Sequence, residues 1–191
     1  MNESGREIEV KLRFDLPEDA AARLRELGAV ETVARSFEDN VLFDRADDPL
    51  HAAGKALRLR RVGGRSIVTY KGPVEGAHRY KVRIEHETVV GDGDSAERIL
   101  LGLGYTPHWR YQKYRTEFDL DDLHVCLDES PLGCYVELEG APEAIDRNAA
   151  RLGFSVDDYI TESYRKLLEI EAARCGREPW DLVFDAGDFT R

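Results

Sequence analysis

Charged and apolar side chains alternate strictly over residues 7–14. Glu7, Glu9, Lys11 and Arg13 occupy one parity, and apolar residues occupy the other. Because successive side chains of a strand point to opposite faces, this pattern predicts a strand with one charged face and one apolar face. Further extended segments, most of them with the same alternation, follow at residues 34–44, 56–62, 66–71, 79–89, 109–120, 125–128 and 135–139.

Other segments carry the start and stop signals of helices. Pro17 opens a segment that Gly28 ends, and Asp94 with Glu97 resembles a capping box that opens another. Two more helices are predicted over residues 142–152 and 161–174, the second with Thr161 as its N-cap. Strands and helices together predict an α+β fold, in which Gly63-Gly64 makes a tight hairpin turn.

Length and composition narrow the class of protein. A chain of 191 residues suits one buried domain, which we expect over 1–176 with a tail, 177–191, packing on it. The formal charge of −11 argues against nucleic-acid binding by overall positive charge. Three cysteines without a C-x-x-C pair fit neither a disulfide framework nor a zinc ribbon. With no apolar run of about 20 residues to span a bilayer, we expect a cytoplasmic protein that does not enter membranes.

The charged strand faces admit two interpretations. They can face solvent with ion pairs across strands, and periodicity alone cannot distinguish this from an inward orientation. Long ionisable side chains nevertheless keep one parity in strand after strand, and several helices are available to cover the apolar face. We therefore favour an antiparallel β-barrel, closed or nearly closed, with a charged interior and helices packed outside. Such an interior must be hydrated, since unpaired buried charge is costly.

The residue types on the charged faces indicate phosphate chemistry. Carboxylate clusters suit Mg²⁺ or Mn²⁺, because these cations are bound by protein carboxylates and phosphate oxygens together. Arginine and lysine bind phosphate directly. No nucleophile with an adjacent base stands out, and phosphoryl transfer does not require one. The acids are Glu7, Glu9, Glu85, Glu87, Asp128, Glu137 and Glu139, and the bases are Lys11, Arg13, Arg58, Arg60, Lys71, Lys81, Arg83, Lys113 and Arg115.

A known family shares these residues in the same order. Residues 7–11 have the form E-x-E-x-K, and they are followed by R-L-R at 58–60, T-Y-K-G-P at 69–73, R-I-E-H-E at 83–87, K-Y-R at 113–115 and G-C-Y-V-E-L-E at 133–139. The series resembles the CYTH superfamily, the triphosphate tunnel metalloenzymes. That superfamily includes thiamine triphosphatases, inorganic tripolyphosphatases and class IV adenylyl cyclases. The resemblance extends over residues 6 to about 168, and Leu42 departs from it by standing where relatives often carry an aromatic residue.

The resemblance implies an eight-stranded antiparallel tunnel and a role for each of the charged residues that line it. It implies Mg²⁺ or Mn²⁺ held by Glu7, Glu9, Asp128, Glu137 and Glu139. It implies that Glu85 and Glu87 assist catalysis or position water, beside Glu7, Glu9 and Lys11. It implies phosphate contacts from Lys11, Arg58, Arg60, Lys71, Arg83, Lys113 and Arg115.

The expected activity is metal-dependent hydrolysis of a triphosphate, whether inorganic tripolyphosphate, thiamine triphosphate or a nucleoside triphosphate. A class IV adenylyl cyclase, which converts ATP to cyclic AMP and pyrophosphate, needs the same charges, and the sequence does not separate the two. A non-catalytic polyphosphate-binding module ranks third, and a purely structural acidic protein last. The expected partner is a small triphosphate, bound by a monomer or a homodimer. His86 and His124 are assigned no role.

Overall fold

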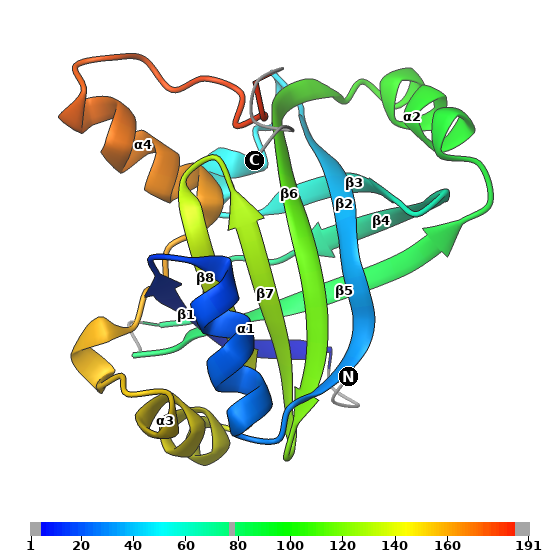
Figure 1. Cartoon of the computed structure of the whole chain (residues 1–191). Coiled ribbons are helices and arrows are strands. Elements are labelled where there is room, and N and C mark those ends of the chain that lie inside the picture. Colours follow the sequence, from blue (N-terminus) through cyan, green and yellow to red (C-terminus); the bar gives the residue numbers. More distant parts are fainter. Residues whose placement is uncertain (1–4, 77–78, 186–191) are drawn as a thin grey trace.

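The computed structural model describes residues 5–76 and 79–185, in which eight strands form a closed antiparallel barrel (Figure 1). The order around the barrel is β1-β5-β4-β3-β2-β6-β7-β8. The strands are β1 (Arg6–Phe14), β2 (Val30–Asp44), β3 (Ala56–Val62), β4 (Arg65–Lys71), β5 (Lys81–Val90), β6 (Thr106–Leu120), β7 (Leu123–Ser130) and β8 (Gly133–Glu139). The helices of the described residues are α1 (Pro17–Glu26), α2 (Gly93–Gly102), α3 (Pro142–Arg151) and α4 (Tyr164–Arg174), with 3₁₀ turns η1 (His51–Ala53) and η2 (Val156–Asp158).

Both faces of β1 are buried at its centre, although Arg13 near its end is exposed. The burial at the centre decides between the two interpretations of the charged strands. Val10 and Leu12 are 0% exposed, whereas Glu9 and Lys11 on the opposite face are only 5% and 2% exposed. A sheet with a solvated charged face would leave the second pair open to water. The charged face therefore lines the interior of the barrel, and the predicted α+β barrel is confirmed.

Helices cover the apolar outer face, as expected. Leu24 of α1 and Ile145 of α3 are 0% exposed and lie in one core with Val10 and Val136 of the barrel wall. On the far side, α2 buries Leu100 in a second core with strands β2 and β3. Figure 1 shows these three helices on the outside of the barrel. None of the four helices in the described ranges is long and apolar enough to cross a membrane.

Helix α4 and the following tail pack together on β6. Tyr164 and Leu168 of α4 share an aromatic core with Trp109 and Leu182. The Gln112 N–H donates to the Leu182 carbonyl at 2.8 Å, and the Leu182 N–H donates to the Arg110 carbonyl at 2.9 Å. The tail therefore forms a short parallel bridge with β6 at Tyr111. This bridge lies before Tyr114, the residue at which β6 begins to pair with β7. Residues 186–191 of the tail lie outside the described part of the chain.

Local signals in the sequence place turns better than helix starts. Gly63 and Gly64 have φ of 53° and 76°, as a tight hairpin turn between the paired Val62 and Arg65 requires. The N-cap of α2 is Asp92 rather than Asp94, because the Asp92 carboxylate accepts the Asp94 N–H at 3.0 Å.

The predicted start of the last helix is also corrected. Ser163, not Thr161, caps α4, since its hydroxyl accepts the Lys166 N–H at 3.2 Å. Two long strands start earlier than predicted: β2 starts at Val30 rather than residue 34, and β6 starts at Thr106 rather than residue 109. The reason is that β2 and β6 pair with each other along their whole length.

Candidate active site

Every predicted site residue except Asp128 lines one cavity of about 1060 Å³ inside the barrel. The antiparallel registers bring these residues together. On β1 and β8, Glu9 lies opposite Glu139 and Lys11 lies opposite Glu137. On β5, Lys81 lies opposite Glu9. Because side chains two residues apart share a strand face, each register places a whole row of ionisable groups on the inner wall.

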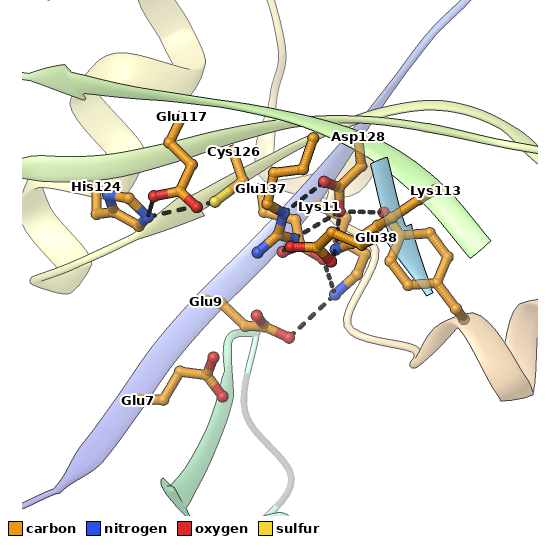
Figure 2. Close-up of polar contacts among 12 residues, drawn as sticks. Glu7, Glu9, Lys11, Glu38, Lys113, Glu117, His124, Cys126, Asp128 and Glu137 are labelled. Atoms are coloured by element: carbon orange, nitrogen blue, oxygen red, sulfur yellow. Dashed lines mark hydrogen bonds and ion pairs between the residues drawn. The ribbon is translucent and has the colours of Figure 1, made fainter. Parts of the chain in front are cut away.

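Asp128 shares the inner face of β7 with Cys126, but it is 0% exposed and its carboxylate is enclosed by donors (Figure 2). Arg115 donates to both of its carboxylate oxygens at 2.6 Å. Lys113 donates at 2.7 Å and the Tyr164 hydroxyl at 2.8 Å, both to Oδ2. A cation would have to displace these donors, so the surroundings of Asp128 suit a role in holding Lys113 and Arg115 in place.

Glu38 lies next to Asp128's partner Lys113, and the alternation of charged residues did not predict it. It is 2% exposed and accepts from Arg60 at 2.9 Å, with the Lys113 ammonium 3.7 Å away. Burial alone would raise the pKa of Glu38, but Lys113, Arg115 and Arg60 outweigh it and hold the pKa well below its usual range. The signal available in the sequence was its position, because it lies on the same strand face as Asn40 and Leu42. Those two residues are not charged, so the alternation did not mark this face as a charged one.

Two of the three arginines of β3, Arg58 and Arg60, line the cavity and are held by side chains of other strands. Arg60 donates to Glu87 at 2.8 Å and Arg58 donates to the same carboxylate at 3.3 Å. Arg58 also donates to the hydroxyls of Thr69, at 3.1 Å, and Tyr111, at 3.2 Å. These contacts fix two guanidinium groups on the cavity wall, where they can bind the oxygens of an anion.

A second set of carboxylates has more negative charge than its neighbours balance. Burial and the charges of Glu7 and Glu9 raise the pKa of Glu139 to about 7. Within the described ranges, no ion pair joins Glu139 to a basic residue. Burial and Glu9 also raise the pKa of Glu7, although Lys71 opposes the shift and Arg83 donates to Glu7 at 3.2 Å. We call Glu7, Glu9 and Glu139 the carboxylate cluster.

Glu9 is the best-balanced member of the cluster. It accepts from Lys81 at 2.6 Å and from Lys11 at 3.0 Å. Burial favours the neutral form of Lys81, and although Glu9 opposes this, nearby Lys11 and Arg83 help to lower its pKa to about 8. Lys81 was recognised on the charged face but given no site role, and it lies directly beside the cluster.

The carboxylate cluster offers the ligand type that a hard divalent cation prefers. Mg²⁺ and Mn²⁺ prefer carboxylate oxygens and keep part of their water, and the cluster offers three carboxylates at the edge of a large cavity. Burial first, and then repulsion by neighbouring glutamates, raise the pKa of Glu7 and of Glu139, and a bound cation would offset both effects. Glu137 differs, because Lys11 at 3.1 Å and Arg115 at 2.5 Å already pair with it.

Asp44, His51 and His108 form another group of possible ligands, with ligand atoms within 4.8 Å of one another. The Asp44 carboxylate is largely occupied. It accepts the N–H groups of Arg45 at 2.7 Å, Leu50 at 2.6 Å and His51 at 3.2 Å, and it contacts the His51 ring. Asp44 therefore orders the loop that follows β2.

Comparisons with known proteins agree with the architecture. The sequence profile described as CYTH domain matches residues 5–164. A protein of Methanocaldococcus jannaschii named "Putative adenylate cyclase" is 27% identical over 172 residues, which covers 84% of this chain and 97% of that protein. The structure of a "putative adenylate cyclase" from Vibrio parahaemolyticus has a TM-score of 0.77 at 21% identity, covering 87% of this chain and 99% of the other.

A plant structure shares the fold at greater distance. It belongs to a "putative adenylyl cyclase" from Hippeastrum that is said to reveal a dominant triphosphatase activity. It has a TM-score of 0.59 at 17% identity and covers 90% of this chain and 97% of the other. Relatives of one barrel architecture are thus described by two different reactions.

Proposed function

Because the chain belongs to the CYTH domain family, we propose that it hydrolyses a triphosphate in its barrel with the help of Mg²⁺ or Mn²⁺. The observation that supports this most is the carboxylate cluster, which carries excess negative charge next to a wall of lysines and arginines. A binding module for anions alone would gain nothing from carboxylates that repel its ligand.

In this proposal Glu7, Glu9 and Glu139 hold the cation. When bound there, the cation would supply positive charge to the phosphate oxygens and would lower the pKa of its water. Glu85 and Glu87 line the same cavity and are assigned the positioning of the attacking water.

The bases are assigned to the phosphates in two groups. Lys71, Lys81 and Arg83 lie beside the carboxylate cluster, where they can stabilise charge that develops at the reacting phosphorus. The remaining phosphate contacts are assigned to Arg58, Arg60, Lys113 and Arg115, which line the same cavity. Lys11 is 2% exposed between Glu9 and Glu137, so we assign it to orienting those carboxylates.

A second candidate, supported by the names of two relatives, is the adenylyl cyclase reaction. The same charges would bind ATP, but the ribose 3′ hydroxyl would attack the α-phosphorus and pyrophosphate would leave. The choice depends on which phosphorus lies next to the carboxylate cluster. The products from ATP therefore distinguish the two reactions.

The test is a product analysis with purified protein, Mg²⁺ or Mn²⁺, and tripolyphosphate, thiamine triphosphate or ATP in turn. Release of inorganic phosphate supports hydrolysis, whereas cyclic AMP with pyrophosphate supports the cyclase. Stabilisation of the fold by the anion with no product under either metal would support a binding module and refute both reactions.

Two matched variants connect the activity to the site. Glu139→Gln is expected to lower turnover about 100-fold, as loss of a major electrostatic contact at a reacting centre does. Glu129→Gln on the preceding strand is the control, because Glu129 pairs with exposed Arg35 outside the cavity. Full activity of Glu139→Gln would refute the proposed cation site.

A further inference from the structure

The two asparagines among the described residues are both completely buried, but their surroundings differ. Asn148 of α3 and Asn40 of β2 are each 0% exposed. The Asn148 amide donates to the Ala144 carbonyl at 3.1 Å, and its oxygen accepts from Arg151 at 2.6 Å. Neither the nitrogen nor the oxygen of the Asn40 amide has a hydrogen-bond partner within the described chain. An unpaired buried amide lowers stability, whereas a leucine of the same branched shape would not.

Asn40 lies on the inner wall of the barrel, next to residues that line the cavity. Its partners on the two adjacent strands are Arg60 of β3 and Tyr111 of β6, and both of them line the cavity. Residues directly opposite each other on adjacent strands point to the same side of the sheet, with Cβ atoms about 4.5–5.5 Å apart. The unpaired amide is therefore a neighbour of the Arg60 side chain.

Arg60 has an unpaired group of its own. Its terminal nitrogens donate to Glu38 at 2.9 Å and to Glu87 at 2.8 Å. Its Nε is buried and has no hydrogen-bond partner in the part of the chain that the structure describes. A donor on β3 and an amide oxygen on β2 thus stand at facing positions without partners. One hydrogen bond between them would satisfy both groups.

Glu87 holds Arg60 in this arrangement, and it is a contact that an anion can replace. A single oxygen of Glu87 accepts from Arg60 at 2.8 Å, from Thr69 at 2.8 Å and from Arg58 at 3.3 Å. The Glu87 side chain is 32% exposed, so it is accessible from the cavity. Phosphate oxygens bind guanidinium groups as carboxylates do, and they compete for the same donors. When the Arg60 guanidinium turns from Glu87 to a phosphate, its Nε–H turns with it.

We propose that Asn40 is a positioning residue for the anion: its amide oxygen accepts the Arg60 Nε–H when Arg60 exchanges Glu87 for a phosphate oxygen. This role rests on the proposed function, because it requires a phosphate group in contact with Arg60. The hydrogen bond forms only in the bound state, so it favours binding, while the free protein keeps an unpaired amide. Glu87, released from Arg60, becomes free to position water.

Binding of tripolyphosphate to the full chain in EDTA, measured by calorimetry, tests this role. Asn40→Leu keeps the branched shape of the side chain and removes the amide. We expect it to weaken binding about tenfold, as loss of a hydrogen bond from a charged donor does. The melting temperature of the free variant should equal or exceed that of the wild-type protein. Asn40→Ala, which adds no volume, should weaken binding to the same extent.

Asn148→Leu is the matched control, because Asn148 is equally buried but lies in α3 on the outside of the barrel (Figure 1). It removes an amide that is paired, so it should lower the melting temperature and leave the affinity for tripolyphosphate unchanged. The two leucine variants should therefore have opposite effects on stability and on binding.

A double-mutant cycle tests whether Arg60 is the partner of Asn40. Lysine has a methylene group in place of Nε–H, so Asn40→Leu should cause no further loss of affinity in an Arg60→Lys background. In an Arg58→Lys background the tenfold loss should remain. The Arg58 Nε is also unpaired, but Arg58 lies opposite Leu42 rather than Asn40.

Equal affinity of the wild-type protein and a folded Asn40→Leu variant would overturn this role and leave the proposed function intact. A tenfold loss that persists in the Arg60→Lys background would overturn it as well. A wild-type protein that binds no tripolyphosphate in EDTA would also refute the role of Asn40. The product analysis with Mg²⁺ or Mn²⁺ would then decide the proposed function by itself, so the two failures are distinguishable.

Discussion

Glu137 and Glu139 stand two residues apart on the same face of β8, yet their surroundings are opposite. Glu137 pairs with Lys11 and Arg115, and these cations outweigh its burial and hold its pKa well below the usual range. Burial and two neighbouring glutamates raise the pKa of Glu139 to about 7. Position on an inner face therefore does not define the role of a carboxylate; the groups on the adjacent strands do.

The strand register explains the difference. Glu137 lies opposite Lys11 on β1, whereas Glu139 lies opposite Glu9. The region around Asp128, Glu38 and Glu137 is a paired region, in which each carboxylate has cationic partners. The carboxylate cluster lies one row further along the barrel. The first region holds bases in position, and the second is suited to a cation.

The largest expected effect is from Asp128→Asn, which removes the charge that balances buried Lys113 and Arg115. Breaking a buried pair by removing one partner costs about 3–5 kcal/mol, and we expect that loss in the free energy of unfolding, measured with urea. Asp119→Asn is the control, since the Asp119 side chain is 66% exposed and its loss should change stability by less than about 0.5 kcal/mol.

The Asp128 experiment can also reverse the assignment. A variant as stable as the wild-type protein that has lost its affinity for Mg²⁺ would place Asp128 among the metal ligands, as the family resemblance implies. It would also mean that the paired region and the carboxylate cluster act as one site.

The next effect compares the two glutamates of β8 directly. Glu137→Gln removes a negative charge that balances the buried Lys11 and Arg115. We therefore expect the free energy of unfolding to fall by about 3 kcal/mol. Glu139→Gln removes a charge that has no basic partner, so stability should stay the same or rise. Urea unfolding of the metal-free proteins measures both, and equal losses would contradict the comparison.

The sequence predicts the faces of the strands better than the pairings between them. Alternation on β1 placed Glu9 and Lys11 on one face, and the family order indicated that this face is internal. Glu38 was missed, because its neighbours on that face, Asn40 and Leu42, are uncharged and break the pattern. The enclosure of Asp128 could not be predicted, since one of its partners, Tyr164, comes from α4.

Asp44 extends the comparison to a carboxylate paired mostly with neutral donors. Burial would raise its pKa, but the His51 ring and three backbone N–H groups lower it to about 2. The folded state therefore gains stability from this group above pH 3.8, and the gain disappears as the pH falls through about 2. Asp44→Asn should lose about 1.5 kcal/mol at pH 7, after allowance for solvent screening, and about half as much at pH 3.

The measurement for Asp44 is urea unfolding of the wild-type protein and Asp44→Asn at both pH values. Asp48→Asn, in the exposed part of the same loop, is the control and should differ little at either pH. A difference for Asp44→Asn that does not change with pH would show that neutral donors hold the residue without favouring its charge.

The smallest expected effect isolates one donor of the paired region. Tyr164→Phe removes the hydroxyl that donates to Asp128 at 2.8 Å but keeps the aromatic ring, which lies 5.6 Å from the Lys11 ammonium and 5.4 Å from that of Lys113. Asp128 keeps its contacts with Lys113 and Arg115, so the loss should be about 1 kcal/mol in unfolding free energy. Tyr159→Phe, which loses a half-buried contact with Asp146, should cost less. A loss above about 3 kcal/mol would mean that α4, rather than the two bases, holds Asp128 in place.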